Sequence, residues 1–211
     1  MSESDLKNFR PPMWPGAAPL QGRYSVLTRM NPDRDAEAMQ EAVDDAVFDY
    51  LPYGPFKDAR GYRDWMDDFG SQPDPVFYAI HPEGADGTRG VASYLRITPP
   101  VGTIEIGHIA LSPELQRTRA ATEALSMMIA WAFEAGYRRV EWKCNAANEA
   151  STRAARRLGF TYEGTFRQAA IVKGKNRDTA WFAIIDGDWP AIRKAHEAWL
   201  RPSNFDADGR Q

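Results

Sequence analysis

The stretch LSPELQRTRAATEAL, residues 111–125, joins an apolar run to an amphipathic one and decides how the chain is interpreted. Before it, TIEIGHIAL at 103–111 is typical of a strand; after it, residues 120–135 carry apolar side chains at helical spacing, up to Gly136. The first N–H groups of a helix lack partners within it, and the helix dipole favours an anion there. The two arginines and two threonines at this junction therefore suggest an anion-binding cradle, with a solvated turn as the alternative that these residues alone leave open.

Length and composition favour a single domain with additional segments at its two ends. The chain has 211 residues, of which 43% are hydrophobic and 26% charged. No apolar run approaches the roughly 20 residues that span a bilayer, and the charged, proline-rich start lacks the apolar stretch of a secretory signal, so we expect a cytoplasmic protein. The single cysteine, Cys144, can form neither an internal disulfide nor a zinc site by itself, and no metal is expected.

The chain divides into a proline-rich arm (1–23), a main domain (24–187) and a C-terminal helix with a polar tail (188–211). The patterns predict strands at 24–30, 76–80, 90–97, 103–111 and 137–144, a hairpin over 162–185, and helices at 36–51, 62–69, 120–135 and 148–158. Such an order of elements predicts an α/β (α+β) fold, in which helices pack on a mixed sheet.

Three segments carry a family resemblance: IEIGHIALSPELQRTRAATEA, NEASTRAARRLGF and the following YEGTFRQAAI. With the element order, they resemble the GNAT superfamily of acyl-CoA N-acyltransferases over residues 24–186, and most closely its branch of ribosomal-protein N-terminal acetyltransferase-like enzymes. The resemblance implies a mostly antiparallel sheet that splays between its fourth and fifth strands. The family signature is Gln or Arg, two residues, Gly, one residue, then Gly or Ala. Gln116 and Ala121 match it, whereas Arg119 replaces the glycine.

Arg119 at the glycine position of this signature leaves two alternatives for the cradle. Either the loop keeps helical angles and Arg119 adds charge for the ligand, or its side chain blocks the site; we expect the first. The resemblance assigns acetyl-CoA to the splay, with the pantetheine on the main chain of the fourth strand and the diphosphate on the following loop. The implied cofactor-binding residues are Ile109, Ala110, Leu111, Gln116, Arg117, Thr118, Arg119, Ala120, Ala121, Thr122, Asn148 and Ser151.

Acetyl transfer from a thioester to an amine needs a neutral amine, a polarised carbonyl and a proton for the thiolate. Glu105 and His108 are the candidate bases, and strand alternation predicts that they lie on opposite faces. Ser151 is the candidate acid. Asn148, which matches the family's Asn-x-x-Ser together with Ser151, is equally well explained as a helix cap. The tyrosine of many family members corresponds to Ala155 and a further branch glutamate to Ala170, so that Tyr137 or Tyr162 would have to substitute.

The implied function is acetyl-CoA-dependent transfer of an acetyl group to a primary amine, by direct attack on the thioester. The acceptor would be a protein N-terminus or a small basic amine attracted by the acidic residues before Val76, and a homodimer is compatible with the family. A non-catalytic acyl-CoA sensor is the alternative. Nucleic-acid binding is disfavoured, because no aromatic platform accompanies the basic residues that would carry it: Arg138, Arg139, Arg153, Arg156 and Arg157.

Overall fold

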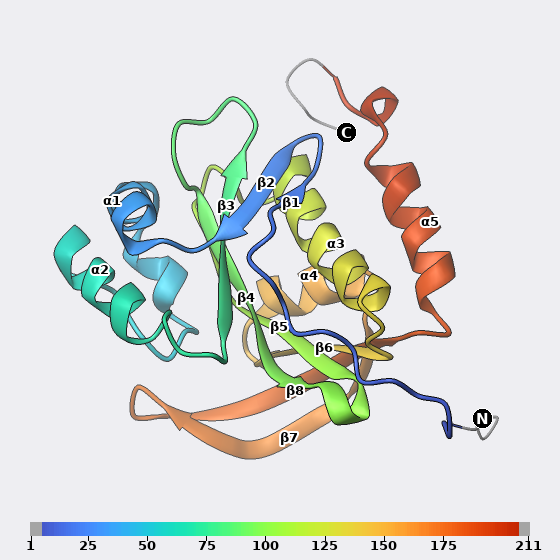
Figure 1. Ribbon diagram of the computed structural model, residues 1–211. Helices are drawn as coiled ribbons and strands as arrows, with labels where there is room; N and C mark the ends of the chain where they lie inside the picture. Colours follow the sequence, from blue (N-terminus) through green and yellow to red (C-terminus); the bar gives the residue numbers. More distant parts are fainter. Residues whose placement is uncertain (1–5, 207–211) are drawn as a thin grey trace.

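Eight strands form one mixed sheet in the order β1-β2-β3-β4-β5-β6-β8-β7, within residues 6–206, the part of the chain that the computed structural model describes (Figure 1). The strands are β1 (Leu20–Gln21), β2 (Ser25–Arg29), β3 (Val76–Pro82), β4 (Gly90–Thr98), β5 (Thr103–Leu111), β6 (Arg139–Asn145), β7 (Thr161–Val172) and β8 (Lys175–Ile185). All neighbours pair antiparallel except β5 and β6. Residues 1–5 of the expected arm and 207–211 of the expected tail lie outside the described residues.

Each of the four longer helices before β7 begins at a side chain that accepts a hydrogen bond from its first turn. Asn31, Asp58, Thr118 and Asn148 cap α1 (Pro32–Ala42), α2 (Ala59–Asp68), α3 (Arg119–Glu134) and α4 (Glu149–Arg157). The C-terminal helix α5 (Trp189–Trp199) follows β8, and short 3₁₀ turns η1 (Asp45–Phe48), η2 (Pro99–Val101) and η3 (Pro202–Asn204) complete the elements. None of the helices in residues 6–206 is long and apolar enough to cross a membrane.

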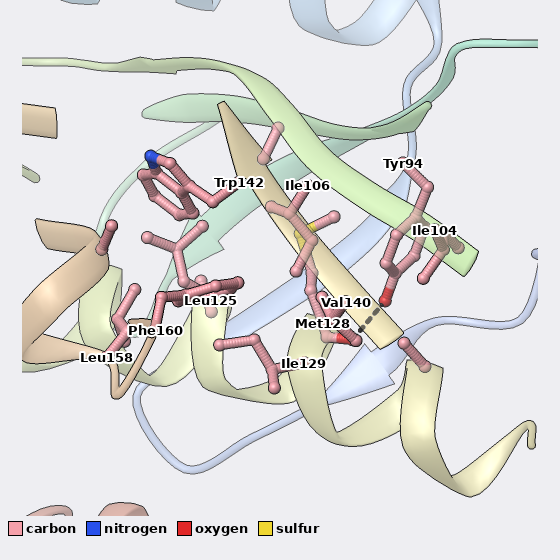
Figure 2. Close-up of a cluster of buried hydrophobic side chains, with 14 of the residues drawn as sticks. Tyr94, Ile104, Ile106, Leu125, Met128, Ile129, Val140, Trp142, Leu158 and Phe160 are labelled. Carbon is pink, nitrogen blue, oxygen red and sulfur yellow. Dashed lines mark hydrogen bonds between the residues drawn. The ribbon is translucent and has the colours of Figure 1, made fainter. Parts of the chain in front are cut away.

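The helices cover the sheet from two sides, α1 and α2 from one and α3 and α4 from the other (Figure 1). On the α3 face, Ile104, Ile106 and Val140 pack against Met128 and Ile129 in the main core (Figure 2). A second cluster on the α1/α2 face includes Met39, Tyr62, Val91 and Ala110. This arrangement confirms the predicted fold class, a mixed and mostly antiparallel sheet flanked by helices.

Glu123 in α3 fixes the chain that leads into β2. Its carboxylate accepts hydrogen bonds from the amides of Arg23, Tyr24 and Ser25 at 2.6 to 2.9 Å. A Cβ on Gly22 would lie 2.3 Å from Glu123 Oε2, so that only glycine permits this approach. The side chain thereby ties the first strands to the helix that begins at the predicted cradle.

The predicted helix over 36–51 is wrong in its second half. The helix ends at Ala42, Val43 is extended, and the Asp44 side chain accepts from the amide of Val47 to start the 3₁₀ turn η1. Asp44 and Asp45 favour such local side-chain bonds over a continued helix, which outweighs the apolar spacing. The short strand β1 also falls inside the segment expected to be an arm.

Candidate active site

The sheet opens between β5 and β6. These parallel strands pair only at Thr103, Ile104 and Glu105, opposite residues 139–141, although both strands continue beyond this point. The other edge of β6 stays paired with β8 through Asn145. Residues 106–111 of β5 therefore face an opening, which is the predicted splay between the fourth and fifth strands when counting begins at β2. Main-chain groups of Ile109, Ala110 and Leu111 lie along it.

The three residues predicted to bind the pantetheine through their main chain differ in where their side chains go. Ala110 is buried in the cluster on the α1/α2 face, whereas Ile109 and Leu111 pack against the main core on the α3 face. The carbonyl of Leu111 already accepts from Gln116 Nε2 at 3.0 Å. The Gln116 side chain thus holds the loop against the end of β5, in the place where the sequence suggested a ligand contact.

The loop before α3 presents unpaired amides. Arg117 has a left-handed φ of +61°, and Thr118 caps the helix by accepting from the amide of Ala121 at 3.1 Å. Within residues 6–206 the amides of Arg117, Arg119 and Ala120 have no acceptor. Arg119 and Ala120 belong to the first helical turn and Arg117 precedes its cap, so the helix dipole adds to the attraction of these amides for an anion. A cavity of about 250 Å³, lined in part by Thr118, Arg119 and Ala120, adjoins this turn and does not reach Glu105 or Ser151.

The side-chain donors of this loop are arranged differently from the prediction. The hydroxyl of Thr118 donates to the carbonyl of Leu115, and that of Thr122 donates to the carbonyl of Thr118. Because a hydroxyl has one proton, neither threonine has a second one to donate to a phosphate in this arrangement.

Arg119 keeps ordinary helical angles as the first residue of α3, as expected in the first of the two alternatives. Its guanidinium lies over the ring of Tyr24, 4.5 Å from the centroid, and near Phe205. A second guanidinium reaches the first turn from α4, where Arg157 Nη1 donates to Thr122 Oγ1 at 2.9 Å. From the sequence, Arg157 enters only the nucleic-acid alternative, because nothing local reveals that the end of α4 meets the start of α3.

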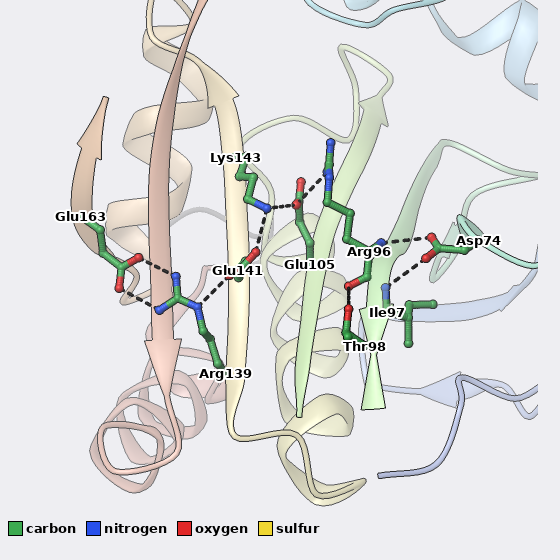
Figure 3. Close-up of polar contacts among 9 residues, drawn as sticks. All are labelled: Asp74, Arg96, Ile97, Thr98, Glu105, Arg139, Glu141, Lys143 and Glu163. Atoms are coloured by element: carbon green, nitrogen blue, oxygen red, sulfur yellow. Dashed lines mark hydrogen bonds and ion pairs between the residues drawn. The ribbon is translucent and has the colours of Figure 1, made fainter. Parts of the chain in front are cut away.

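Glu105 stands in a chain of ion pairs on the α1/α2 face whose members come from β4, β5, β6 and β7 (Figure 3). Its Oε2 lies 2.8 Å from Arg96 Nη1 on β4 and 2.9 Å from Lys143 Nζ on β6. Lys143 also contacts Glu141, and Arg139 joins Glu141 to Glu163 on β7. Glu105 is only 3% exposed and Lys143 is 8% exposed, so this pair is largely desolvated, whereas Arg96 and Glu163 at the two ends of the chain are exposed.

Burial raises the pKa of the Glu105 carboxyl, and the positive charges of Lys143 and Arg96 oppose that rise. No described residue donates a hydrogen bond to its Oε1. That oxygen lies beside Gly107, 3.6 Å from the position that a Cβ would take there. Glu105 is therefore a carboxylate with one anchored oxygen and one oxygen directed along the open part of β5, where it can accept a proton.

The predicted placement of Glu105 and His108 on opposite faces is wrong. The register between β4 and β5 shifts between Val91 and Ser93, and His108 has a left-handed φ of +49°. This β-bulge inserts one residue and reverses the alternation, so that His108 joins Glu105 on the α1/α2 face. Its ring stacks on Tyr53 at 5.6 Å and contacts Phe69 and Phe77.

Burial in this aromatic surround lowers the pKa of His108 to about 4, helped by the charges of Arg96 and Arg177. The imidazole is therefore neutral at pH 7 and a weaker base than an ordinary histidine. Of the two predicted bases, Glu105 has a raised pKa, which suits proton removal near neutral pH. His108 has a lowered pKa, which makes it the weaker base.

Asn148 and Ser151 lie at the start of α4, on the α3 side of the opening. Asn148 caps the helix by accepting from the amide of Ser151 at 3.0 Å, which is the structural role that the sequence offered. Ser151 Oγ accepts from Trp142 Nε1 at 3.0 Å. An indole N–H only donates, so this bond leaves the hydroxyl proton of Ser151 free to point elsewhere.

The two tyrosines considered as substitutes for the missing family tyrosine are occupied elsewhere. Tyr137 is buried and its hydroxyl donates to the carbonyl of Met13 in the N-terminal segment. The Tyr162 hydroxyl shares a hydrogen bond with Thr165 on β7. Ala155 is buried in the core and Ala170 is exposed on β7.

The family model of the acetyltransferase (GNAT) domain matches residues 26–161. The crystal structure of a GCN5-related N-acetyltransferase from Brucella melitensis is 39% identical, with a TM-score of 0.94 over 98% of this chain and 96% of that one. A probable acetyltransferase of the GNAT family from Chromobacterium violaceum ATCC 12472 is 40% identical, with a TM-score of 0.84 over 90% and 97%. No curated protein matches the sequence.

A ribosomal-protein-S5-alanine acetyltransferase from Vibrio fischeri is 19% identical and covers 82% of this chain and 98% of its own, with a TM-score of 0.63. At that identity the likeness extends to the fold alone. The family match spans more than half of the chain, and the two more similar structures cover nearly all of it. The chain therefore belongs to the GNAT family and is an acetyltransferase.

Proposed function

We propose that this enzyme transfers the acetyl group of acetyl-CoA to a primary amine, of a protein N-terminus or a small basic molecule, by direct attack on the thioester. The observation that carries the proposal is the opening between β5 and β6. It has unpaired amides at one end, on the first turn of α3, and a buried carboxylate and an oriented serine hydroxyl on its two sides.

The residues present suit coenzyme A. The amides of Arg117, Arg119 and Ala120 would hold its diphosphate, and Arg157 at Thr122 would add a charge-assisted contact. Residues 109–111 would pair with the pantetheine amides along the unpaired edge of β5. When bound, acetyl-CoA supplies an activated acetyl thioester, and the remaining tasks fall to the protein.

Glu105 would remove the proton of the incoming amine from the α1/α2 face. For an α-amine with a pKa near 8, deprotonation at pH 7 costs on the order of 1 kcal/mol, whereas a lysine-like amine near 10.4 costs about 4.6 kcal/mol. A carboxylate whose pKa is raised by burial is a better base than an exposed one, so Glu105 reduces this cost most for the more basic amine.

Ser151 would donate its proton to the leaving sulfur from the opposite, α4 side. The Trp142 hydrogen bond occupies one lone pair of Oγ and thereby restricts where the hydroxyl proton points. Because Glu105 and Ser151 flank the opening from opposite faces, proton removal and proton donation occur on opposite sides of the thioester. Cys144 is buried and its Sγ lies 3.7 Å from Thr152 Oγ1, which gives no reason to invoke an acetyl-cysteine intermediate.

We further propose, from the motif resemblance, that the enzyme belongs to the ribosomal-protein N-terminal acetyltransferase-like branch. We also propose that it acts in the cytoplasm, with residues 24–187 as the catalytic unit. The segments IEIGHIALSPELQRTRAATEA and NEASTRAARRLGF support the branch, since they contain both the cradle and the Asn-x-x-Ser pair. Acetylation of a ribosomal-protein N-terminal peptide would test this assignment.

Glu105→Gln and Ser151→Ala, assayed separately against a panel of amines, test the mechanism. We expect each to lower kcat by about a hundredfold or more while acetyl-CoA binding by calorimetry stays within about threefold. Glu141→Gln is the matched control, because it also removes a carboxylate from Lys143 but lies where β6 is still paired with β5. Unchanged turnover in both active-site variants would refute the assigned roles. Acetyl-CoA binding without turnover of any amine would favour the sensor alternative.

A further inference from the structure

Arg177 on β8 is half-buried, and the charge of Glu105 acts on it. Within residues 6–206 its side chain forms no hydrogen bond or ion pair, and its Nε is buried and unsatisfied. Trp181, on the same face of β8, also has a buried Nε1 that finds no acceptor among the described residues. Buried donors in proteins are nearly always paired, and a desolvated charge without a counterion is costly. Two such donors on one strand face indicate that an acceptor is supplied from outside the chain.

The strand register places these donors at the wide end of the opening between β5 and β6. Trp181 pairs with Lys143, whose Nζ lies 3.8 Å from the centroid of the indole ring. Arg177 follows on the same face, beyond the last residue pair of β6 with β8, Asn145 with Thr179. This face is the one that carries Glu105 and His108, and the charge of Arg177 contributes to the low pKa of His108.

The η1 segment and the β7–β8 hairpin form a wall at this end. Lys173 Nζ, at the hairpin turn, donates to the carbonyl of Phe48 at 2.8 Å. The Tyr50 hydroxyl donates to the carbonyl of Ala147, just before α4. Tyr53, in the same connection, stacks on His108, and its buried hydroxyl has no hydrogen-bond partner in the part of the chain that the structure describes. A small molecule that enters here would meet Arg177, Trp181 and this aromatic side on its way to Glu105.

On this face of β4, β5, β6 and β8, the side chains of Arg96, Lys143 and Arg177 lie near those of Glu105 and Glu141, and the two carboxylates already contact Arg96 and Lys143. Among these three cations in the described residues, Arg177 is the one that forms no ion pair with a carboxylate. The diphosphate of coenzyme A does not suit it, since the start of α3 lies on the other side of the sheet (Figure 1). A guanidinium presents Nε and an Nη as a fork that matches a carboxylate in geometry and charge.

We propose that the amine acceptor also carries a carboxylate, and that Arg177 binds this group while Glu105 receives the amine. The inference rests on the proposed acetylation of an amine and narrows its acceptor class. The carboxylate belongs to a free amino acid or to an acidic residue near a peptide N-terminus. In both cases Arg177 sets the distance between the anchored carboxylate and the amine, so it is a specificity-determining residue.

Two matched sets of acceptors test the proposal. The first contains phenylalanine, phenylalaninamide and phenethylamine, whose ring would pack against Tyr53 and His108. The second contains Ala-Asp-Ala-amide and Ala-Asn-Ala-amide. We expect the carboxylate member of at least one set to have a kcat/KM at least tenfold above its uncharged counterpart, and the set concerned distinguishes the two sources.

Arg177→Gln is expected to abolish this preference and to leave kcat/KM for the uncharged members within about twofold, while Arg177→Lys retains part of it. Arg167→Gln, an exposed change on β7, is the matched control and should keep the full preference. The proposal is wrong if no carboxylate member is preferred in either set, or if the preference survives in Arg177→Gln. Turnover of the uncharged amines without preference would overturn this inference alone, whereas no turnover of any amine would overturn the proposed function as well.

Discussion

His108 is expected to make the stability of the protein depend on pH through its buried, neutral ring. Its folded-state pKa of about 4 lies below the ordinary value of 6.5. As the pH falls below about 6.5, the unfolded chain takes up a proton that the folded protein does not. The stabilisation is therefore fully present above pH 6.5 and is lost progressively as the pH falls towards 4.

The magnitude follows from the difference of 2.5 pH units between these values, at 1.36 kcal/mol per unit. The complete loss is about 3 kcal/mol below pH 4, and about 2 kcal/mol of it falls between pH 8 and pH 5. His108→Gln removes the titrating group. The free energy of unfolding of the wild type, minus that of the variant, should then decrease by about 2 kcal/mol between pH 8 and pH 5.

Urea unfolding followed by far-UV circular dichroism at several pH values measures this difference. Lost ring contacts with Tyr53 and Phe69 destabilise the variant by an amount that does not change with pH. His81 and His196 titrate in both proteins and cancel in the difference. A difference that stays constant within about 0.5 kcal/mol from pH 8 to pH 5 would refute the idea that the bulge buries His108 in its neutral form.

Three further outcomes are expected. Arg157→Gln should weaken acetyl-CoA binding about tenfold in calorimetry, roughly 1.4 kcal/mol, whereas Arg153→Gln on the exposed side of α4 should leave it unchanged. If the Arg157→Gln variant binds acetyl-CoA as tightly as the wild type, Arg157 is not part of the cradle. Trp142→Phe should lower kcat roughly fivefold to tenfold at an unchanged affinity for acetyl-CoA, since Ser151 loses its orienting donor; an unaltered kcat would contradict that role. Glu123→Gln should reduce the free energy of unfolding by about 2 to 4 kcal/mol in urea, because an amide group would face backbone donors, and a loss below 1 kcal/mol would count against it.

The sequence predicted those parts of the fold that depend on local patterns. Runs of strand-forming residues between turn-rich segments identified β4 and β5, and the long apolar stripe after Thr118 identified α3 to within one residue at each end. Asn148 was recognised as a cap because the preference for such residues before a helix is strong and local. The splay followed from the family resemblance, since no local pattern marks the point where two parallel strands separate.

The active site was less predictable, because it depends on contacts between distant segments and on two irregular residues. Arg96 and His108 both have positive φ within strands, and each bulge shifts the side chains that follow it. Asp74 holds the first bulge by accepting from the amides of Arg96 and Ile97 (Figure 3). Strict alternation of side chains along a strand does not anticipate an inserted residue. It therefore predicts, wrongly, that His108 and Glu105 lie on opposite faces of the sheet.

The basic residues show the same limit. In the sequence, Arg157 is one of several arginines in α4, and Arg177 lies in a polar hairpin without any motif. Only the packing of α4 against the start of α3 gives Arg157 its place, and only the pairing of β8 with β6 brings Arg177 to the opening. Charge alone did not distinguish these residues from solvated ones.

A crystal structure of the complex with acetyl-CoA tests the central claim most directly. We expect the diphosphate oxygens within hydrogen-bond distance of the amides of Arg117, Arg119 and Ala120, and the thioester in the opening between Glu105 and Ser151. Acetyl-CoA bound with its diphosphate away from the first turn of α3, or with its thioester outside the opening between β5 and β6, would contradict the account.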